Sequence, residues 1–313
     1  MKSLNRAYSR LDMQRRYEAW FLRFGLADGS GAWWLRYLLT NPGRSGCSRI
    51  PGAAPAQLWA TWFPRDAHPE TFIQEFPVNA VKLGSRAQPF SLKIGPNVIE
   101  DDGCRGVIEA RGKKISWDLV YRSHFAATLS NKAWIGFSRT PHSDAVVRGS
   151  IRLGERTFRG DPLGVGVQGH NCGFRHRDFW TWMHACFPQP DRSMSTLEAL
   201  VYEMPMGLRF RKAVLWHEGR AYQFPGLREQ VRDSGDLRWE FSGAAAAGSI
   251  DVAVYGRGVS LHRLPYAKTD CSGVFEVSNN SRASARIRAR LADVPPVDLT
   301  TEGGAVLEMT GAY

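Results

Sequence analysis

Short runs of alternating apolar and polar residues cover most of the chain. Runs of period two are typical of strands with one buried face, and the Gly, Pro, Asn, Asp and Ser residues between them are typical of turns. In the first half the pattern predicts strands at 17–26, 32–39, 57–63, 71–77, 90–94, 98–100, 106–110 and 115–121. In the second half it predicts strands at 150–153, 156–159, 164–172, 179–187, 197–203, 208–217, 220–224, 238–241, 250–255, 260–264, 273–278 and 283–289.

This many short strands favours antiparallel barrels or sandwiches. A small barrel closes at about eight strands, so the pattern predicts an all-β chain with two barrel-like or sandwich-like halves. Residues 122–147 show no clear alternation and are interpreted as the connection. The expected domains are therefore residues 1–145 and 146–313.

Residues 164–187 carry the most chemistry, because they hold three of the eight histidines and two of the five cysteines. We expect them to form a hairpin closed by a short loop at 173–178. Side chains two apart share a strand face. The first strand of the hairpin would then have a polar face and the second an aromatic face. This combination is typical of a small-molecule site. The two faces consist of Gln168, His170 and Cys172 on the first strand, and Trp180, Trp182, His184 and Cys186 on the second.

Composition indicates a globular protein, with 43% hydrophobic and 12% aromatic residues in 313. The net charge of +11 favours anionic partners, such as nucleic acid, a membrane surface or an acidic ligand. However, the arginines alternate with apolar residues, as at Arg286, Arg288 and Arg290, and no nucleic-acid-binding motif is present. We therefore predict no nucleic-acid partner. No phosphate loop or nucleophile elbow occurs either, so no cofactor is predicted.

The cysteines and the N-terminus bear on the compartment. Five widely spaced cysteines do not form a disulfide framework, and their odd number fits a reducing compartment. Residues 1–26 are basic without an apolar core, and no run approaches 18 apolar residues, so we expect neither a secretory signal nor a membrane span. The expectation is a cytoplasmic protein whose residues 1–16 leave open a peripheral contact with an anionic membrane surface.

The central segment also resembles the signature of a known superfamily, the carotenoid hydratases (hydroxyneurosporene synthases), tocopherol cyclases and AttH-like proteins. The matching residues are Gly166, His170, Asn171, Gly173, Trp180 and Trp182, with looser similarity at 17–21, 33–37 and 116–119. The resemblance implies two lipocalin-like barrels and a hydrophobic, isoprenoid-like ligand at or between them. It also implies acid-assisted hydration, cyclisation or isomerisation in some members.

Protonating an alkene requires an acid in a dry, aromatic site, where burial keeps a carboxyl protonated and rings stabilise a cation. Carboxyls beside aromatic residues or a cysteine are candidates, and His170 is a further proton donor. The candidate catalytic residues are His170, Asp118, Glu203 and Asp270. The candidate substrate-binding residues are Gln168, Asn171, Trp180, Trp182, His184 and Tyr202. If the strand is regular, Asn171 faces away from His170 and is a structural hydrogen-bonding residue.

Two alternatives stay open. A lipocalin-like barrel can carry a hydrophobic ligand without transforming it, because binding and catalysis differ by a few placed groups. The pairs His170-x-Cys172 and His184-x-Cys186 could also face each other on adjacent strands as a tetrahedral zinc set, although the chain has no Cys-x-x-Cys turn.

Overall fold

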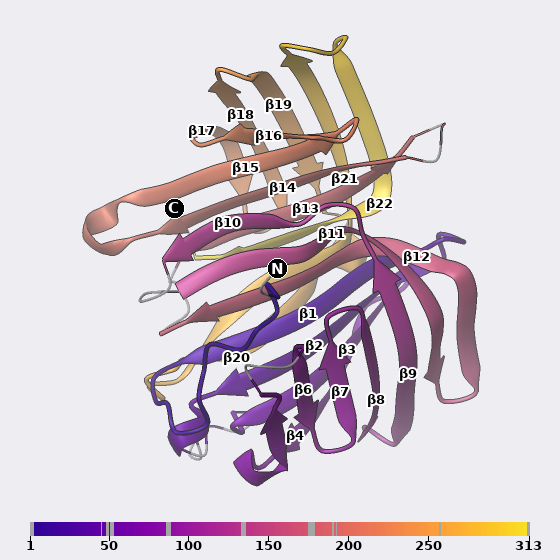
Figure 1. The fold of residues 1–313 in the computed structure, drawn as a ribbon, viewed down its shortest axis with the longest axis vertical. Helices are drawn as coiled ribbons and strands as arrows, with labels where there is room; N and C mark the ends of the chain where they lie inside the picture. Colours follow the sequence, from indigo (N-terminus) through magenta and orange to yellow (C-terminus); the bar gives the residue numbers. More distant parts are fainter. Residues whose placement is uncertain are drawn as a thin grey trace.

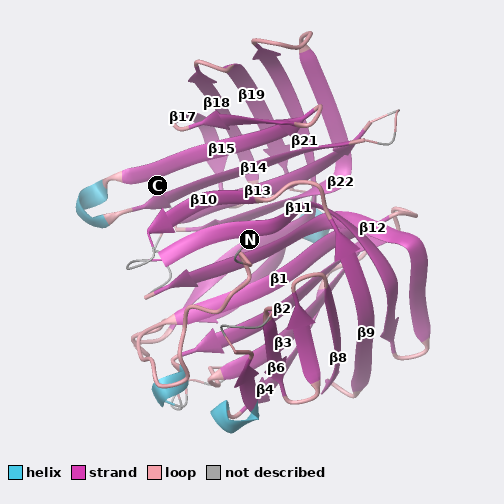
Figure 2. Ribbon diagram, viewed as in Figure 1, coloured by secondary structure: helices cyan, strands magenta, loops and turns pink. Residues whose placement is uncertain are grey.

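The computed structural model describes residues 3–44, 46–47, 50, 53–85, 89–132, 136–174, 179–189, 191, 193–256 and 258–311. Within these residues the structure is mostly β-strand, as predicted, with four short 3-10 helices (Figure 2). The first twelve strands are β1 (Tyr17–Leu26), β2 (Gly31–Thr40), β3 (Ala56–Pro64), β4 (Glu70–Phe76), β5 (Val81–Leu83), β6 (Ser91–Ile94), β7 (Asn97–Glu100), β8 (Gly103–Ala110), β9 (Lys113–Arg122), β10 (Ala127–Lys132), β11 (Gly136–Leu153) and β12 (Arg156–Gly173).

The remaining strands are β13 (Trp180–Pro188), β14 (Met194–Glu203), β15 (Arg209–His217), β16 (Arg220–Phe224), β17 (Leu227–Asp233), β18 (Arg238–Ala245), β19 (Gly248–Tyr255), β20 (His262–Ala267), β21 (Val274–Leu291) and β22 (Val297–Thr310). The 3-10 helices are η1 (Pro42–Arg44), η2 (Val78–Ala80), η3 (Pro205–Gly207) and η4 (Gly258–Ser260).

The strands form two antiparallel sheets with the same connectivity except for two additional strands at one edge of the first (Figure 1). The first sheet has the order β4-β3-β2-β1-β12-β11-β9-β8-β7-β6-β5, with β10 attached to β11. The second has the order β16-β15-β14-β13-β22-β21-β19-β18-β17, with β20 attached to β21. In each sheet the first strand of the unit pairs with its last strand. The two halves are therefore a structural repeat that the sequence does not show letter by letter.

The boundary between the halves lies later in the chain than we expected. The first sheet ends at Gly173 and the second begins at Trp180, so the strands β10 and β11, which include most of the expected connection, are part of the first sheet. The predicted hairpin at 164–187 does not form, because β12 pairs with β1 and β11 whereas β13 pairs with β14 and β22. Within its expected loop, residues 175–178 lie outside the described residues. Most of β11 was not predicted as a strand, because register shifts between residues 139 and 149 interrupt its period of two.

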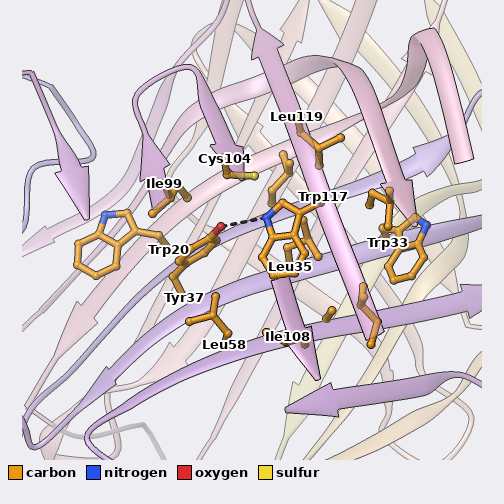
Figure 3. Packing of buried hydrophobic residues seen from close by; sticks show 14 of the residues in the cluster. Trp20, Trp33, Leu35, Tyr37, Leu58, Ile99, Cys104, Ile108, Trp117 and Leu119 are labelled. Carbon is orange, nitrogen blue, oxygen red and sulfur yellow. Dashed lines mark hydrogen bonds between the residues drawn. The ribbon is translucent and has the colours of Figure 1, made fainter. Parts of the chain in front are cut away.

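Each sheet encloses its own apolar core. The first sheet curls until β4 meets β8, where the backbone amide of Glu109 donates to Gln74 Oε1 at 3.0 Å, and so approaches a closed barrel. Inside it, the Trp117 indole donates to the Tyr37 hydroxyl at 3.0 Å (Figure 3). That hydroxyl donates in turn to the carbonyl of Val98 at 3.1 Å, so the polar atoms of Trp117 and Tyr37 are both paired.

The outer faces of the two sheets pack against each other. A third apolar cluster joins Phe21, Trp34 and Trp59 of the first unit to Tyr266 and Val277 of the second. The strands β10 and β20, which lie outside the main strand order of their sheets, also contact the opposite unit. In one contact, Ser130 of β10 lies 3.0 Å from the Tyr202 hydroxyl of β14. In another, His262 of β20 lies 2.6 Å from the Thr71 hydroxyl of β4.

Arg23 fastens this contact. Its guanidinium is 1% exposed and donates to the carbonyl oxygens of Ser281, Gly303, Gly304 and Ala305 in the second unit. These carbonyls are available because the pairing of β21 with β22 shifts register between residues 280 and 285. Burial lowers the pKa of Arg23 to about 10, although Cys186 raises it and Arg282 lowers it further.

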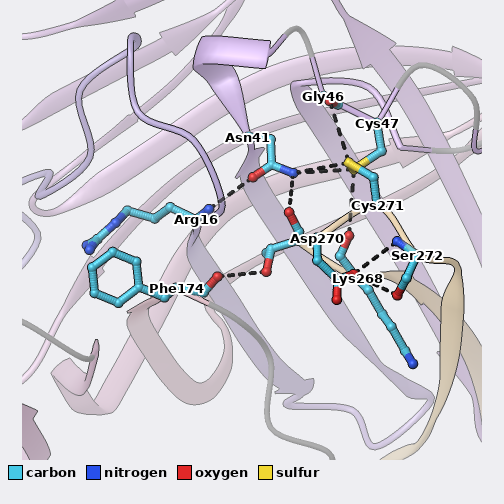
Figure 4. The surroundings of a disulfide bond; sticks show 10 residues. Arg16, Asn41, Gly46, Cys47, Phe174, Lys268, Asp270, Cys271 and Ser272 are labelled. Carbon is cyan, nitrogen blue, oxygen red and sulfur yellow. Dashed lines mark hydrogen bonds between the residues drawn. A yellow bond between two sulfur atoms is a disulfide. The ribbon is translucent and has the colours of Figure 1, made fainter.

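A disulfide between Cys47 and Cys271 also links the two units, and Asn41 donates to the carbonyl of Thr269 beside it at 2.6 Å (Figure 4). The cysteine spacing predicted no disulfide framework and did not identify this pair. Since disulfides persist mainly in oxidising compartments, the pair argues against the reducing compartment inferred from the odd number of cysteines. The other cysteines, Cys104, Cys172 and Cys186, are free and buried.

Among the described residues, no helix has the length and apolar character needed to cross a membrane.

Arg23→Leu is expected to lower the free energy of unfolding by at least about 3 kcal/mol, because it leaves several buried carbonyls without donors. Urea denaturation measures the change. The control is Arg152→Leu, since Arg152 is exposed and donates only to Gly154, and its effect should stay within about 0.5 kcal/mol. Equal effects of the two substitutions would show that Arg23 does not fasten the units.

Candidate functional site

The Trp-x-Trp pair lies between the two sheets, and each indole donates a hydrogen bond to a carboxyl group. Trp182 Nε1 is 2.9 Å from Glu198 Oε1 on β14, and Trp180 Nε1 is 3.1 Å from Glu308 Oε1 on β22. Strand β13 runs between those two strands, and its register sets His184 opposite Glu198. One sheet face therefore gathers two carboxyls, two indoles and an imidazole.

Glu198 is buried among neutral hydrogen-bond donors. It is 2% exposed, and the Thr140 hydroxyl lies 2.8 Å and 2.7 Å from its two oxygens. Among the described residues, no cation lies within ion-pair distance of it. Burial raises the pKa of Glu198 to about 7, against the lowering effects of Thr140, Trp182 and Lys212. A carboxyl group in this setting is largely protonated at slightly acidic pH and can serve as an acid.

His184 is a neutral neighbour of Glu198. Its Nε2 lies 2.7 Å from the carbonyl oxygen of Ser143, so this nitrogen carries the proton and donates. Burial lowers the pKa of His184 to about 3, as does Arg23, while the hydrogen bond to Ser143 raises it. The remaining nitrogen, Nδ1, is buried and has no partner among the described residues. It is an acceptor on the same sheet face as Glu198.

Glu308 is the second carboxyl group of this face. Besides the Trp180 indole, Asn279 Nδ2 donates to it at 3.2 Å. Burial raises the pKa of Glu308, whereas Arg36, Asn279, Trp180 and Tyr266 lower it. Glu308 retains partial exposure, as do Trp180 and Trp182. Glu308 therefore lies at the edge of the buried region.

Aromatic side chains from both units line the same region. The Phe21 ring meets Trp182 edge-on at 5.5 Å between ring centroids, and Trp59 meets Tyr266 at 5.6 Å. Tyr202 stacks on Phe210 at 4.8 Å. Apolar and aromatic walls with a few polar groups are the usual composition of a small-molecule site. The contact between the two units is thus the candidate site.

His170 does not belong to this site. It lies inside the first barrel, stacked on Trp20 at 4.6 Å, with Nε2 2.8 Å from Glu18 Oε1 and Nδ1 2.8 Å from the carbonyl of Leu4. Both residues of the pair are fully buried. The pair holds the N-terminal segment in place, because Glu18 also accepts hydrogen bonds from the backbone amides of Tyr8 and Ser9.

The other predicted binding residues divide between these two regions. Gln168 is buried beside His170 and exchanges hydrogen bonds with Asn5 at 3.1 Å and 2.9 Å. Asn171 faces the opposite way and is half-buried, as strand alternation predicts. Trp180, Trp182, His184 and Tyr202 lie together on one face of the second sheet.

The three carboxyls proposed from the sequence are corrected by the structure. Asp118, Glu203 and Asp270 are all exposed. Their aromatic or cysteine neighbours in sequence point to the other side of the chain, so none has the dry surroundings that alkene protonation requires. The side chain and backbone of Ser272 donate to Asp270, which lowers the pKa of that carboxyl.

Glu198 and Glu308 were missed, although the sequence does carry a signal. Each is a lone acidic residue in a run that is apolar on both strand faces, Leu197–Tyr202 and Ala305–Met309. Strands of this kind are buried on both sides. A single carboxyl within such a strand is therefore a better candidate than one beside an aromatic residue at a strand end.

The zinc alternative loses its geometric basis. His170 and Cys172 lie on the barrel side of β12, whereas His184 and Cys186 lie on β13, which does not pair with β12. Within the described part of the chain, no three His, Cys, Asp or Glu side chains form a group suited to a metal ion.

Comparison with known proteins adds evidence on the fold. No family model matches the sequence. Two uncharacterised proteins, from two strains of Mycobacterium tuberculosis, are each 29% identical over 144 residues, which is 43% of this chain. The match spans only 40% of the length of those relatives.

Solved structures match over nearly the whole chain. CghA with Sch210972 has a TM-score of 0.60 at 11% identity, covering 94% of this chain and 88% of that one. Kievitone hydratase from Nectria haematococca has 0.55 at 10%, covering 99% and 95%. An AttH-like protein from Nitrosomonas europaea has 0.54 at 12%, covering 97% and 94%.

Fold and site together define an all-β protein of two lipocalin-like units with carboxyl groups buried between them. At 10–12% identity, the likeness to these solved structures concerns the fold.

Gly169 allows the two sheets to approach. A Cβ atom there would lie 2.2 Å from the ring of Phe21, the residue that packs against Trp182. We expect Gly169→Val to lower the free energy of unfolding by about 1–3 kcal/mol. Gly226→Ala is the control, since nothing lies within 4 Å of its added Cβ, and it should change stability little. Chemical denaturation compares them, and a stable Gly169→Val variant would disprove the packing argument.

The Glu18–His170 pair predicts a loss of stability in acid. Burial raises the pKa of Glu18, but hydrogen bonding and charge from His170, with donors at Tyr8 and Ser9, lower it further, so the net pKa is below its usual value. A lowered carboxyl pKa stabilises the fold above the unfolded value of about 4.5 and loses that effect as pH falls through the folded pKa.

Glu18→Gln should therefore be less stable than wild type by about 3–5 kcal/mol at pH 7. It should also lack the part of the acid-induced loss that Glu18 causes. Denaturant titrations between pH 7 and 3 measure both. Parallel pH profiles for the two proteins would contradict the assignment.

Proposed function

We propose that the protein catalyses an acid-assisted hydration, cyclisation or isomerisation of an apolar, unsaturated small molecule bound between its two units, with Glu198 as the proton donor. The observation that carries the proposal is a fully buried carboxyl held by the neutral donors Thr140 and Trp182, beside an aromatic wall. An isoprenoid-like ligand fits the apolar and aromatic character of that wall.

The reaction follows from these contacts. The Glu198 carboxyl transfers its proton to one carbon of a double bond, and the π faces nearby stabilise the carbocation that forms on the other. In a hydration, water adds to the cation and returns a proton to the Glu198 carboxylate. In a cyclisation, a second double bond attacks the cation, and the new cation loses a proton to the Glu198 carboxylate. In an isomerisation, a C–H next to the first cation loses its proton to the same carboxylate. Thr140 and Trp182 hydrogen-bond the carboxylate between the two transfers.

The solved structures support the proposal at the level of fold. Kievitone hydratase is a hydratase by name, and CghA was solved with the small molecule Sch210972. A two-unit fold of this kind therefore accommodates a small-molecule ligand in one relative and a hydration enzyme in another. The residues that would perform the chemistry here are inferred from this chain alone.

Single-turnover assays with a panel of polyenes and prenylated quinols test the proposal. Glu198→Gln should slow turnover by about 10²–10⁴-fold while ligand binding persists. Glu203→Gln is the matched control, since Glu203 lies on the same strand but is exposed, and it should retain full activity. Turnover of wild type should fall as pH rises through about 7, because the acid is then deprotonated.

Two results would overturn the proposal. If wild type binds members of the panel but returns all of them unchanged, the protein is a carrier. If Glu198→Gln turns over ligand as fast as wild type does, another group supplies the proton.

A further inference from the structure

Arg36 is a buried cation with a donor nitrogen that has no acceptor among the described residues. It lies on β2, is 5% exposed, and its Nη1 is buried without a hydrogen-bond partner among the described residues. Three rings surround the guanidinium, at 4.3 Å for Tyr266, 5.4 Å for Trp59 and 5.7 Å for Trp34, measured to the ring centroids. The rings hold the charge by cation–π attraction but offer its N–H groups no in-plane acceptor.

Arg23 shows what a satisfied arginine looks like in the same contact between units. It donates to four backbone carbonyls, whereas no hydrogen bond from Arg36 is found among the described residues. Leaving a buried donor unpaired is costly, and more so for a charged group. A structural role alone would not need a guanidinium here, because an apolar side chain would fill the aromatic cage better.

Nearby groups do not neutralise Arg36. Glu308 is close enough to interact electrostatically, yet no ion pair within 4.0 Å forms between the two among the described residues. Its carboxyl is already engaged by Trp180 and Asn279. Gln57 accepts from the Trp59 indole at 2.8 Å. The aromatic rings thus hold the Arg36 guanidinium in place, and its Nη1 remains available to donate to a ligand.

Arg36 belongs to the same aromatic cluster as the Trp-x-Trp pair. Tyr266, which covers the guanidinium, lies 6.4 Å from Trp180, and Trp180 is two residues from the Trp182 that donates to Glu198. A guanidinium fork is suited to carboxylate-like oxygens. A ligand whose polar end meets Arg36 would direct its apolar part along Trp180 and Trp182.

We propose that Arg36 binds an anionic oxygen of the ligand, a carboxylate or an enolate, so that the substrate is an unsaturated organic acid rather than a neutral hydrocarbon. This assignment rests on the proposed function in one respect, the placement of the ligand between the two units. The aromatic cage positions the guanidinium, and Glu198 lies toward the apolar end of the bound molecule.

Binding of all-trans-retinoate and all-trans-retinol tests the assignment, because the two probes share an unsaturated apolar body and differ in the charged end. Quenching of tryptophan fluorescence reports affinity for each. Wild type should bind retinoate at least about tenfold more tightly than retinol. Arg36→Met should weaken retinoate binding by about 10–100-fold and leave retinol binding within about twofold.

Arg36→Lys keeps the charge but loses the fork, so its retinoate affinity should fall between those of wild type and Arg36→Met. Arg65→Met is the control, since Arg65 is exposed and donates to the carbonyl of Gly29, and it should bind both probes as wild type does. The preference of wild type is itself a test that needs no variant to fold.

The assignment is overturned if wild type binds retinol as tightly as retinoate or binds neither probe, or if Arg36→Met retains full retinoate affinity. Its failure is distinct from failure of the proposed function. Glu198→Gln should keep the retinoate preference of wild type, so a loss of turnover with intact binding affects only the catalytic claim, and a loss of the preference affects only Arg36.

Discussion

The docking of the two units depends on one buried arginine. The Arg23 side chain extends from the first sheet to the second unit and donates there to four backbone carbonyls. These carbonyls are available because the pairing of β21 with β22 is irregular. Burying a guanidinium is costly unless such acceptors are available. Register shifts in a strand pair, often treated as local irregularities, here supply the acceptors that bring two outer sheet faces into contact.

Contact between those faces creates dry surroundings for side chains that would otherwise be solvated. Trp182 and Thr140 donate to Glu198, yet among the described residues no cation forms an ion pair with it, so its protonated form is favoured. The Glu18–His170 pair shows the opposite outcome inside the first barrel, where His170 and two backbone donors favour the carboxylate. Glu18 and Glu198 are similarly buried, so their hydrogen-bonding partners determine which protonation state is favoured.

Strand alternation was sufficient to predict the all-β fold, the two halves and most strands, because one buried face imposes a period of two. It failed at β11, where bulges break the period, and so misplaced the boundary between halves. The residues of the motif between Gly166 and Trp182 lie in different regions of the structure. His170 faces the barrel core with Glu18, and Trp180 and Trp182 face the second unit.

The acids could not be chosen from sequence neighbours. Asp118 follows Trp117 in the chain, but adjacent residues of a strand face opposite sides, so an aromatic neighbour indicates an exposed carboxyl rather than a buried one. Glu198 is recognised only when both faces of its strand are seen to be apolar. Long-range packing determines which strands meet between the two units. Local sequence patterns therefore could not predict that aromatic rings surround Arg36.

The central claim is that Glu198 is a neutral carboxylic acid in the contact between the units near neutral pH. The infrared C=O stretch of protonated carboxyl groups measures this directly, as the difference between wild type and Glu198→Gln across a pH series. The account predicts a protonated-carboxyl band at pH 6 that the variant lacks and that disappears with a midpoint of about 7. A spectrum without such a band at pH 6, or a band that is unchanged in the variant, would contradict it.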